Sequence, residues 1–323
     1  MAAKSASAIS PVQHSLLTDI HTTAPEGDEI GFNHPTLCQI GLPYNDPDKD
    51  RQDGEPRVRL WKRRQGRAYL SVQSIVAVNE HTGEEIEHGL PWGEKARLML
   101  MHFNSQAVKN QSPVIDAEDS MTAFITMLIG RRPNKREIEV VRDQVARLSS
   151  CVISMSGSIG NHGLIRNAQV VDAYELWYPK EPGQRVLWSS RIQLSETYFQ
   201  ALMETAVPID MRAVRVLQNG SLALDLYVWL THRLVRIPIG QRVFIPWGGP
   251  NGLKTQFGYG YTGEDAMKNF KTFFKRTLAR VKSTYPDANL DLDGKGMTLR
   301  SSPPAVKRSL VSVDVSLAPQ LSA

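Results

Sequence analysis

The stretch from residue 264 to 285, EDAMKNFKTFFKRTLARVKSTY, is the strongest constraint on how this 323-residue chain can fold. Its apolar residues recur at spacings of three and four, which places them on one face of an α-helix. They are Met267, Phe270, Phe274, Leu278, Val281 and Tyr285. Glu264 and Asp265 fall in the first turn, where the helix dipole favours acids, and Pro286 follows the last turn. We therefore predict an amphipathic helix that buries its apolar face.

The opposite face of this predicted helix is basic and carries no acid beyond the first turn. Its members are Lys268, Thr272, Lys275, Arg276 and Ser283, with Lys271 and Lys282 on the flank. A solvated surface helix usually mixes both signs of charge, so the imbalance favours a polyanionic partner. The alternative is a docking helix whose lysines only keep the domain soluble, and the helix by itself leaves both interpretations open.

The residues after the helix favour the polyanion. Asn289 to Asp293 alternates polar and apolar residues, a Gly-Lys-Gly turn follows at 294–296, and Met297 to Arg300 completes a β-hairpin pattern. A basic helix followed by a hairpin is the ending of a winged-helix domain. In that domain the helix enters the major groove of DNA, and the hairpin, or wing, lies along the phosphate backbone.

The same order of elements is predicted twice along the chain. The first copy is predicted from helices at 93–108, 119–130 and 134–148, a strand at 113–115, and a hairpin of strands at 151–155 and 166–177. A strand at 184–194 and a helix at 195–206 follow it. The second copy is predicted from helices at 210–217, 221–234 and 252–257, a strand at 242–245, and the basic helix with its hairpin. An extra hairpin with a basic tip is predicted around Arg63 and Arg64.

We therefore predict an α+β fold of two tandem winged-helix domains, with an added N-terminal β-hairpin and disordered termini. Residues 1–33 are expected to form a disordered acidic arm, and residues 34–206 the first winged-helix domain with its added hairpin and strands. Residues 207–302 are expected to form the second, DNA-binding winged-helix domain, and residues 303–323 a disordered tail.

Charge is distributed unevenly along the chain. Residues 1–55 contain three Lys or Arg against nine Asp or Glu, a net of −6, so residues 56–323 carry +11 of the total of +5. A basic body suggests a nucleic-acid partner. The isolated Cys38 and Cys151 indicate neither a disulfide framework nor a zinc site, and no apolar run is long enough for a membrane helix. We expect a cytoplasmic protein without cofactor, metal or membrane partner.

Short segments in a fixed order resemble the RepA replication initiators of bacterial plasmids. They are GLPY at 41–44, GLPWG at 89–93, KAR at 95–97, DA at 172–173, LW at 176–177, VLW at 186–188, VPID at 207–210, LD at 224–225, YVWL at 227–230, PW at 246–247, QFG at 256–258 and SPP at 302–304. The resemblance implies tandem winged helices that bind repeated sites (iterons) in a plasmid origin, help open the duplex, and recruit the host replication initiator and replicative helicase. It also implies a possible homodimer that represses its own promoter.

Two groups of residues are candidates for contact with double-stranded DNA. In the second domain these are Lys268, Lys271, Thr272, Lys275 and Arg276, with Lys282 and Lys295 as candidates for phosphates. In the first domain they are Lys135, Arg136 and Arg147 on the third helix, and Arg131 and Arg132 in the turn before it. Glu139 and Asp143 share the outward face of that third helix, so a dimer or interdomain surface is the alternative there.

Two sequence patterns that resemble a cofactor site and a metal site lie among neighbouring residues that do not suit such sites. The G-x-G-x-x-G run at 258–263 follows a predicted helix instead of a strand, and the calcium-loop pattern from Asn289 ends in Arg300 where a glutamate is needed. Asp225, within an apolar helix, is expected to pair with a nearby basic group or to cap backbone amides, and not to act in catalysis. We therefore predict a non-enzymatic plasmid replication initiator. A winged-helix transcriptional regulator is the alternative, and an origin-nicking enzyme is a third class.

Overall fold

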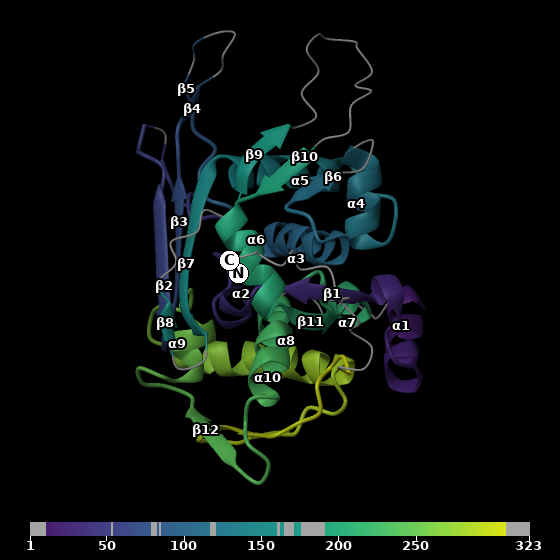
Figure 1. Ribbon diagram of the computed structural model, residues 1–323. Helices are drawn as coiled ribbons and strands as arrows, with labels where there is room; N and C mark the ends of the chain where they lie inside the picture. The colour runs from purple at the N-terminus through teal and green to yellow at the C-terminus, as the bar shows by residue number, and fades with distance from the viewer. Residues whose placement is uncertain are drawn as a thin grey trace.

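The computed structural model describes residues 11–52, 54–78, 83, 85–116, 121–159, 162–164, 171–175 and 191–307. It has the mixed α+β composition that the sequence predicts (Figure 1). The helices are α1 (Pro11–Thr22), α2 (Pro35–Gln39), α3 (Gly93–Asn110), α4 (Met121–Ile129), α5 (Lys135–Ser149), α6 (Glu196–Thr205), α7 (Met211–Leu217), α8 (Ser221–Leu234), α9 (Leu253–Phe257) and α10 (Ala266–Thr284).

Within the residues that the structure describes, the strands form five small antiparallel sheets. They are β1 (Ile30–Asn33), β2 (Leu60–Gln65), β3 (Ala68–Ser74), β4 (Ala77–Val78), β5 (Glu85–Ile86), β6 (Val114–Asp116), β7 (Cys151–Ile159), β8 (His162–Leu164), β9 (Val171–Glu175), β10 (Arg191–Leu194), β11 (Val207–Asp210), β12 (Arg242–Pro246), β13 (Leu290–Leu292) and β14 (Gly296–Arg300). The sheet orders are β1-β11, β6-β10-β9, β12-β14-β13, β2-β3-β7-β8 and β4-β5.

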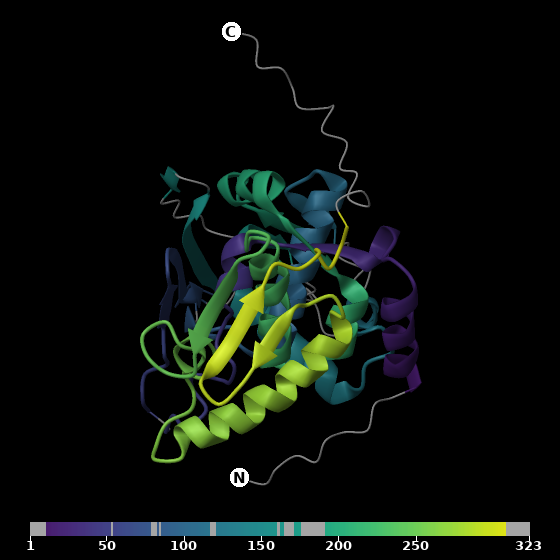
Figure 2. The ribbon, with the colours of Figure 1, turned by 90° about the horizontal axis from the view of Figure 1, so that it is seen from below.

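The C-terminal part of the chain follows the prediction closely. Helix α10 buries Phe270 and Phe274 completely, and the ring of Trp247 contacts both of them edge-on. The predicted hairpin is β13–β14, and β14 also pairs with β12, so that Ile245 lies opposite Met297. Figure 2 shows the long helix α10 beside this three-stranded sheet. The amphipathic helix and the hairpin are therefore both confirmed.

The central part of the chain repeats this topology. Helix α3, strand β6, helices α4 and α5, and strands β9 and β10 occur in the same order as α8, β12, α9, α10, β13 and β14, but strands β7 and β8 are inserted between α5 and β9. In both sheets the first strand pairs with the third, and the third with the second. Asn134 and Glu137 cap the start of α5 reciprocally, with hydrogen bonds of 2.9 and 3.0 Å, so the helix begins where the sequence predicts.

The predicted hairpin of strands 151–155 and 166–177 is wrong. Strand β7 pairs with β3 and β8 in a separate sheet, and the partner of β9 is β10. Both β3 and β7 bury alternate residues, among them Leu70 and Ile153. An alternating pattern fixes which face of a strand is buried and leaves its partner open, which is why the predicted pairing differs from the observed one. Residues 166–170 and 176–177 of this predicted hairpin, and residues 184–190 of the next predicted strand, lie outside the described residues.

The prediction of a disordered acidic arm is wrong for residues 11–33. Helix α1 lies against α7, and β1 pairs with β11, with Phe32 opposite Pro208. The backbone amide of Phe32 also donates to Ser105 Oγ at 2.9 Å. This segment is too short to show a hydrophobic period, and its structure comes from pairing with a strand about 180 residues away. Residues 1–10 lie outside the described part.

The arm is also held by charge. Arg212, at the start of α7, contacts Asp210 at 2.7 Å and Glu29 at 3.7 Å, and it donates to the backbone oxygen of Thr23 at 3.2 Å. Glu29 of the acidic arm therefore compensates part of the positive charge of Arg212.

The first residues of the predicted disordered tail are ordered as well. Val306 is buried, and Tyr285 Oη donates to the backbone oxygen of Pro303 at 2.5 Å. The rest of that tail, 308–323, lies outside the described residues.

A buried ion pair connects α3 with α8. Arg97 Nε lies 2.7 Å from Asp225 Oδ1, and Arg97 Nη2 lies 2.9 Å from Asp225 Oδ2. The same guanidinium donates to the backbone oxygens of Leu42, Pro43 and Gly93. Asp225 is therefore the paired structural carboxylate that the sequence predicts. The pairing of β1 with β11 and this ion pair both join residues before position 206 to residues after it. The division into two domains at residue 206 stays a prediction.

Buried histidines make the stability of this fold depend on pH. Burial lowers the pKa of His102 to about 4 and that of His232 to about 3. Below about pH 6.5 the unfolded chain therefore binds protons that the folded protein does not. We expect the free energy of unfolding to fall between pH 6.5 and 4, by roughly 1–2 kcal/mol for each histidine at pH 5.

Urea unfolding at pH 7 and pH 5 measures this dependence. His102→Gln is expected to reduce it, while His14→Gln, on the exposed side of α1, serves as the control. Equal unfolding free energies at both pH values would contradict the prediction.

Candidate nucleic-acid interface

The exposed face of α10 is the candidate interface. Lys268, Thr272, Lys275 and Arg276 are all exposed, and their spacing of three and four residues keeps them on one side of the helix. The burial of Phe270, Phe274, Leu278 and Val281 fixes this orientation. The structure thus brings these predicted residues together on one surface. Whether they contact DNA stays a prediction.

The positive charge of this face is not compensated. Helix α10 carries six Lys or Arg and no Asp or Glu. Within the described part of the chain, none of the six forms an ion pair. Burial and the neighbouring Arg276 lower the pKa of Arg280, which donates instead to the backbone oxygen of Val216 at 3.2 Å. The helix therefore presents a concentrated positive field to solvent.

Lys271 differs from its neighbours because it is half-buried. Its Nζ lies 5.3 Å from the centre of the Trp247 ring, which places the charge over an aromatic face. The indole N–H of Trp247 donates to the backbone oxygen of Asp293 at 2.9 Å, and its backbone N–H donates to that of Lys295 at 3.2 Å. Trp247 thus connects α10 with the turn of the β13–β14 hairpin.

The hairpin turn presents Lys295 to solvent. Asp293 Oδ1 accepts hydrogen bonds from the backbone amides of Lys295 at 2.7 Å and Gly296 at 2.9 Å. These amides lower the pKa of Asp293, so its carboxylate fixes the turn. Lys282 is exposed near the opposite end of α10. Lys282 and Lys295 are therefore both accessible, as contact with phosphates requires.

Two residues of α10 that the sequence interpretation missed belong to the same surface. Asn269 is exposed next to Lys268, and an asparagine amide can form two hydrogen bonds with adenine. Phe273 is 36% exposed, and its ring centre lies 5.4 Å from Arg276 Cζ. Neither side chain is charged, so the basic pattern of the helix does not identify Asn269 or Phe273.

We call the part of the chain from α3 to β10 the first unit, and the part from α8 to β14 the second unit. In the first unit, the helix that corresponds to α10 is α5, and its basic face is weaker. Arg132, Lys135 and Arg136 are exposed, as is Arg142, which the sequence interpretation missed. Arg131 instead contacts both oxygens of Glu137, at 2.5 and 3.0 Å. The hydrogen bond from Arg131 lowers the pKa of Glu137, and the pairing neutralises much of the Arg131 charge. Arg131 is thus only partly available to a phosphate.

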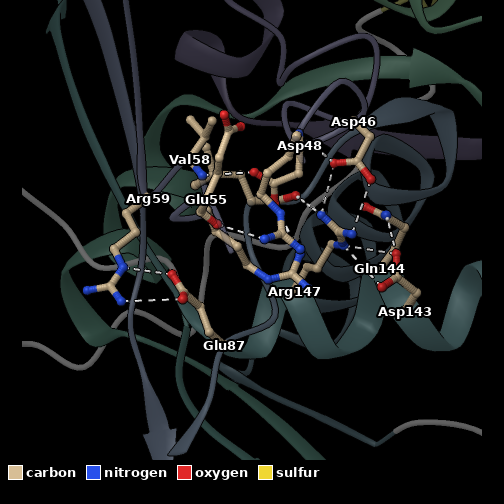
Figure 3. A network of polar contacts seen from close by, with 12 residues as sticks. Asp46, Asp48, Glu55, Val58, Arg59, Glu87, Asp143, Gln144 and Arg147 are labelled. Carbon is tan, nitrogen blue, oxygen red and sulfur yellow. Dashed lines mark hydrogen bonds and ion pairs between the residues drawn. The ribbon is translucent and has the colours of Figure 1, made fainter. Parts of the chain in front are cut away.

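The prediction that Arg147 faces DNA is wrong. Its side chain is 8% exposed and contacts Asp143 at 2.9 Å and Asp46 at 3.3 Å (Figure 3). It also donates to the backbone oxygen of Leu90 at 3.1 Å. Gln144 extends this network by accepting from the backbone amide of Trp92 at 2.8 Å. Because Asp46 is about 100 residues away in sequence, the helical pattern alone could not show that Arg147 is turned inward.

Arg147 therefore affects stability more than binding. We expect Arg147→Ala to lower the free energy of unfolding by about 1–3 kcal/mol, since Leu90 and the two carboxylates lose a charged donor. The salt dependence of DNA binding should remain that of the unchanged protein. Denaturant titration and binding at several salt concentrations check both statements. A less steep salt dependence of DNA binding, with an unchanged free energy of unfolding, would instead indicate that Arg147 contacts DNA.

Two further properties bear on the kind of site. Among the described residues, no three His, Cys, Asp or Glu side chains are grouped as a metal site would need. No helix in this part of the chain has the length and apolar character needed to cross a bilayer.

Comparison with solved structures gives a partial likeness. The crystal structure of RctB domains 2 and 3 has a TM-score of 0.45 and 11% identity, and the match covers 82% of this chain and 94% of that one. A structure of selenomethionine derivatives of the same domains has a TM-score of 0.44 and 12% identity, with 76% and 84% covered. Among curated proteins, none matches the sequence significantly.

A family match covers the central part of the chain. Residues 90–247 match the family described as plasmid encoded RepA protein. The match begins just before α3 and ends at Trp247, so it includes the ion pair between Arg97 and Asp225. Residues 90–247, just under half of the chain, are therefore similar to the plasmid encoded RepA proteins, and the resemblance that the sequence shows is confirmed over this range.

Proposed function

We propose that the chain is a non-enzymatic plasmid replication initiator that binds double-stranded DNA through two winged-helix units. The family match supports a role in plasmid replication. The observation that carries DNA binding is the acid-free exposed face of α10, with its candidate residues on one side of the helix. A helix of this kind beside a three-stranded sheet suits a winged helix.

In this proposal each part of the second unit has a distinct role. The side chains of Lys268, Asn269 and Thr272, in the first half of α10, read base edges in the major groove. Lys275, Arg276, Lys282 and Lys295 contact phosphates, which position the protein without reading sequence. Trp247 keeps the hairpin turn at a fixed position relative to α10, because it contacts both.

The first unit is proposed to bind the adjacent stretch of DNA more weakly. Its third helix and the turn before it keep Arg132, Lys135, Arg136 and Arg142 exposed, while Glu139 on the same helix reduces their net charge. These contacts are expected to be chiefly with the backbone. Two units on successive grooves could bend or strain an AT-rich neighbour, which would help to open the origin.

Repeated origin sites, recruitment of a host initiator and helicase, dimerisation, and repression of its own promoter remain parts of the proposal. They rest on the family resemblance. A plasmid that carries only the DNA around this gene, with and without the gene, tests the replication role. Maintenance that depends on the gene is the expected result. Promoter repression without maintenance would favour the alternative, a winged-helix transcriptional regulator.

Binding to DNA should also depend steeply on salt. With roughly eight phosphate contacts, the logarithm of the binding constant should fall with the logarithm of salt concentration with a slope of about −7. Filter binding or fluorescence anisotropy between low and moderate salt measures this slope. Affinity that hardly changes over that range would contradict the proposed electrostatic interface.

A further inference from the structure

A second basic surface lies outside α5 and α10, on the hairpin of β2 and β3. Residues 56–78 contain six Lys or Arg and no Asp or Glu. Three of the six have partners elsewhere in the fold. Arg57 contacts Asp48 at 3.1 Å, and Arg59 contacts Glu87 at 2.7 Å (Figure 3). The third, Arg63, is directed at the second unit.

The other three basic residues are exposed and uncompensated. Lys62 and Arg64 alternate with half-buried Trp61 and Arg63 along β2, so the two sets lie on opposite faces of the strand. Arg67 follows the turn at Gly66, where φ is +56°. Over the ranges that the structure describes, none of Lys62, Arg64 and Arg67 forms an ion pair. We call these three residues the hairpin cluster.

The hairpin is fixed to the C-terminal end of α9. Arg63 Nη2 donates to the backbone oxygens of Thr255 at 3.0 Å and Gln256 at 2.7 Å. Its Cζ lies 4.4 Å from the centre of the Tyr259 ring, which also contacts Trp61 edge-on. Figure 1 shows β2 and α9 side by side. These contacts place the hairpin cluster next to the helix that directly precedes α10.

The hydroxyl of Tyr259 strengthens this junction. It donates to the backbone oxygen of Leu42 at 3.1 Å and accepts from the backbone amide of Tyr44 at 2.8 Å. The hairpin, the loop around Leu42 and the start of the α9–α10 connection therefore pack as one body. The backbone that carries the hairpin cluster is therefore held at a fixed position relative to α10 and need not be ordered when a ligand binds.

We propose that the hairpin cluster contacts the phosphate backbone of the DNA to which α10 binds, and extends the bound length on the α9 side. This inference rests on the proposed function. Phosphates are the expected partner because the cluster contains only long cationic side chains, exposed on the hairpin and its turn. The contact adds affinity without sequence information, unlike a helix in the major groove.

The triple variant Lys62→Ala, Arg64→Ala, Arg67→Ala tests this proposal. The probe is a duplex from the DNA that flanks the gene, with a scrambled duplex of the same length. Loss of three phosphate contacts should make the salt slope less steep by about 2.7 and weaken both duplexes by on the order of 100-fold at about 0.1 M salt. The hydroxyl-radical footprint should shorten at one end only.

The control is Lys49→Ala with Arg51→Ala, which removes exposed charges from the acidic loop before the hairpin. It should leave slope and footprint unchanged. If the triple variant keeps the original slope while α10 variants reduce it, the hairpin inference is wrong and the proposed function stands. The hairpin inference is equally wrong if the cluster instead captures an acidic protein. If the unchanged protein shows no salt-dependent DNA binding, the proposed function itself fails.

Discussion

Replacing Lys275 and Arg276 together with alanine is expected to abolish most DNA binding. Both side chains are exposed on the acid-free face of α10, and neither has an ion-pair partner in the described structure. Contacts of this kind are worth about 1–3 kcal/mol each, so the pair should contribute roughly 2–6 kcal/mol. The dissociation constant should rise by about 30-fold or more.

The measurement is fluorescence anisotropy with DNA that flanks the gene, at one fixed salt concentration. Lys49→Ala with Arg51→Ala is the matched control, since it removes the same charge from an exposed loop outside α10. Urea unfolding of each variant separates binding from folding. Unchanged affinity in a stable Lys275→Ala, Arg276→Ala protein would show that another face of the molecule meets DNA.

Replacing Arg97 with alanine should cause the largest loss of stability. The side chains of Arg97 and Asp225 are 3% and 9% exposed, and the guanidinium contacts both carboxylate oxygens. Removing one partner of a buried pair leaves a charge without compensation, which costs about 3–5 kcal/mol. Leu42, Pro43 and Gly93 would also lose a donor to their backbone oxygens. We expect a correspondingly lower free energy of unfolding in urea.

A double variant, Arg97→Met with Asp225→Leu, distinguishes a lost ion pair from lost packing. Apolar residues of similar size remove both charges together, so this variant should be more stable than Arg97→Ala. Gly41→Ala provides a second route to the same site, because a Cβ there would lie 2.0 Å from Asp225 Oδ2. It should destabilise the protein without removing any charge. If Arg97→Ala were as stable as the unchanged protein, the pair would be structurally irrelevant.

The local elements near α10 were predictable because their signals are strong and contained within the sequence of each element. Six apolar residues at helical spacing fixed the buried face, and the alternation around the Gly294 turn fixed the hairpin. The exposure of Lys268, Lys275 and Arg276 followed from the same period. In this region the local pattern and the tertiary structure agree.

Contacts between distant parts of the chain could not be predicted. Nothing in the segment around Phe32 identifies β11 as its partner, and an alternating β7 fits β3 as well as β9. Asp225 was expected to have a basic partner, but its spacing does not identify Arg97, 128 residues earlier. Arg147 illustrates the same limit: its helical position is compatible with solvent, and only the approach of Asp46 turns it inward.

Photocrosslinking from Asn269 tests the central claim most directly. A photoreactive phenylalanine at this exposed position of α10 should crosslink to bases within the footprint on DNA that flanks the gene. The same group at exposed Lys49, outside the proposed interface, should not crosslink. The expected result is a set of base crosslinks from position 269 that disappear with Lys275→Ala, Arg276→Ala. A footprint that persists with no crosslink from position 269 would contradict the placement of α10 in the groove.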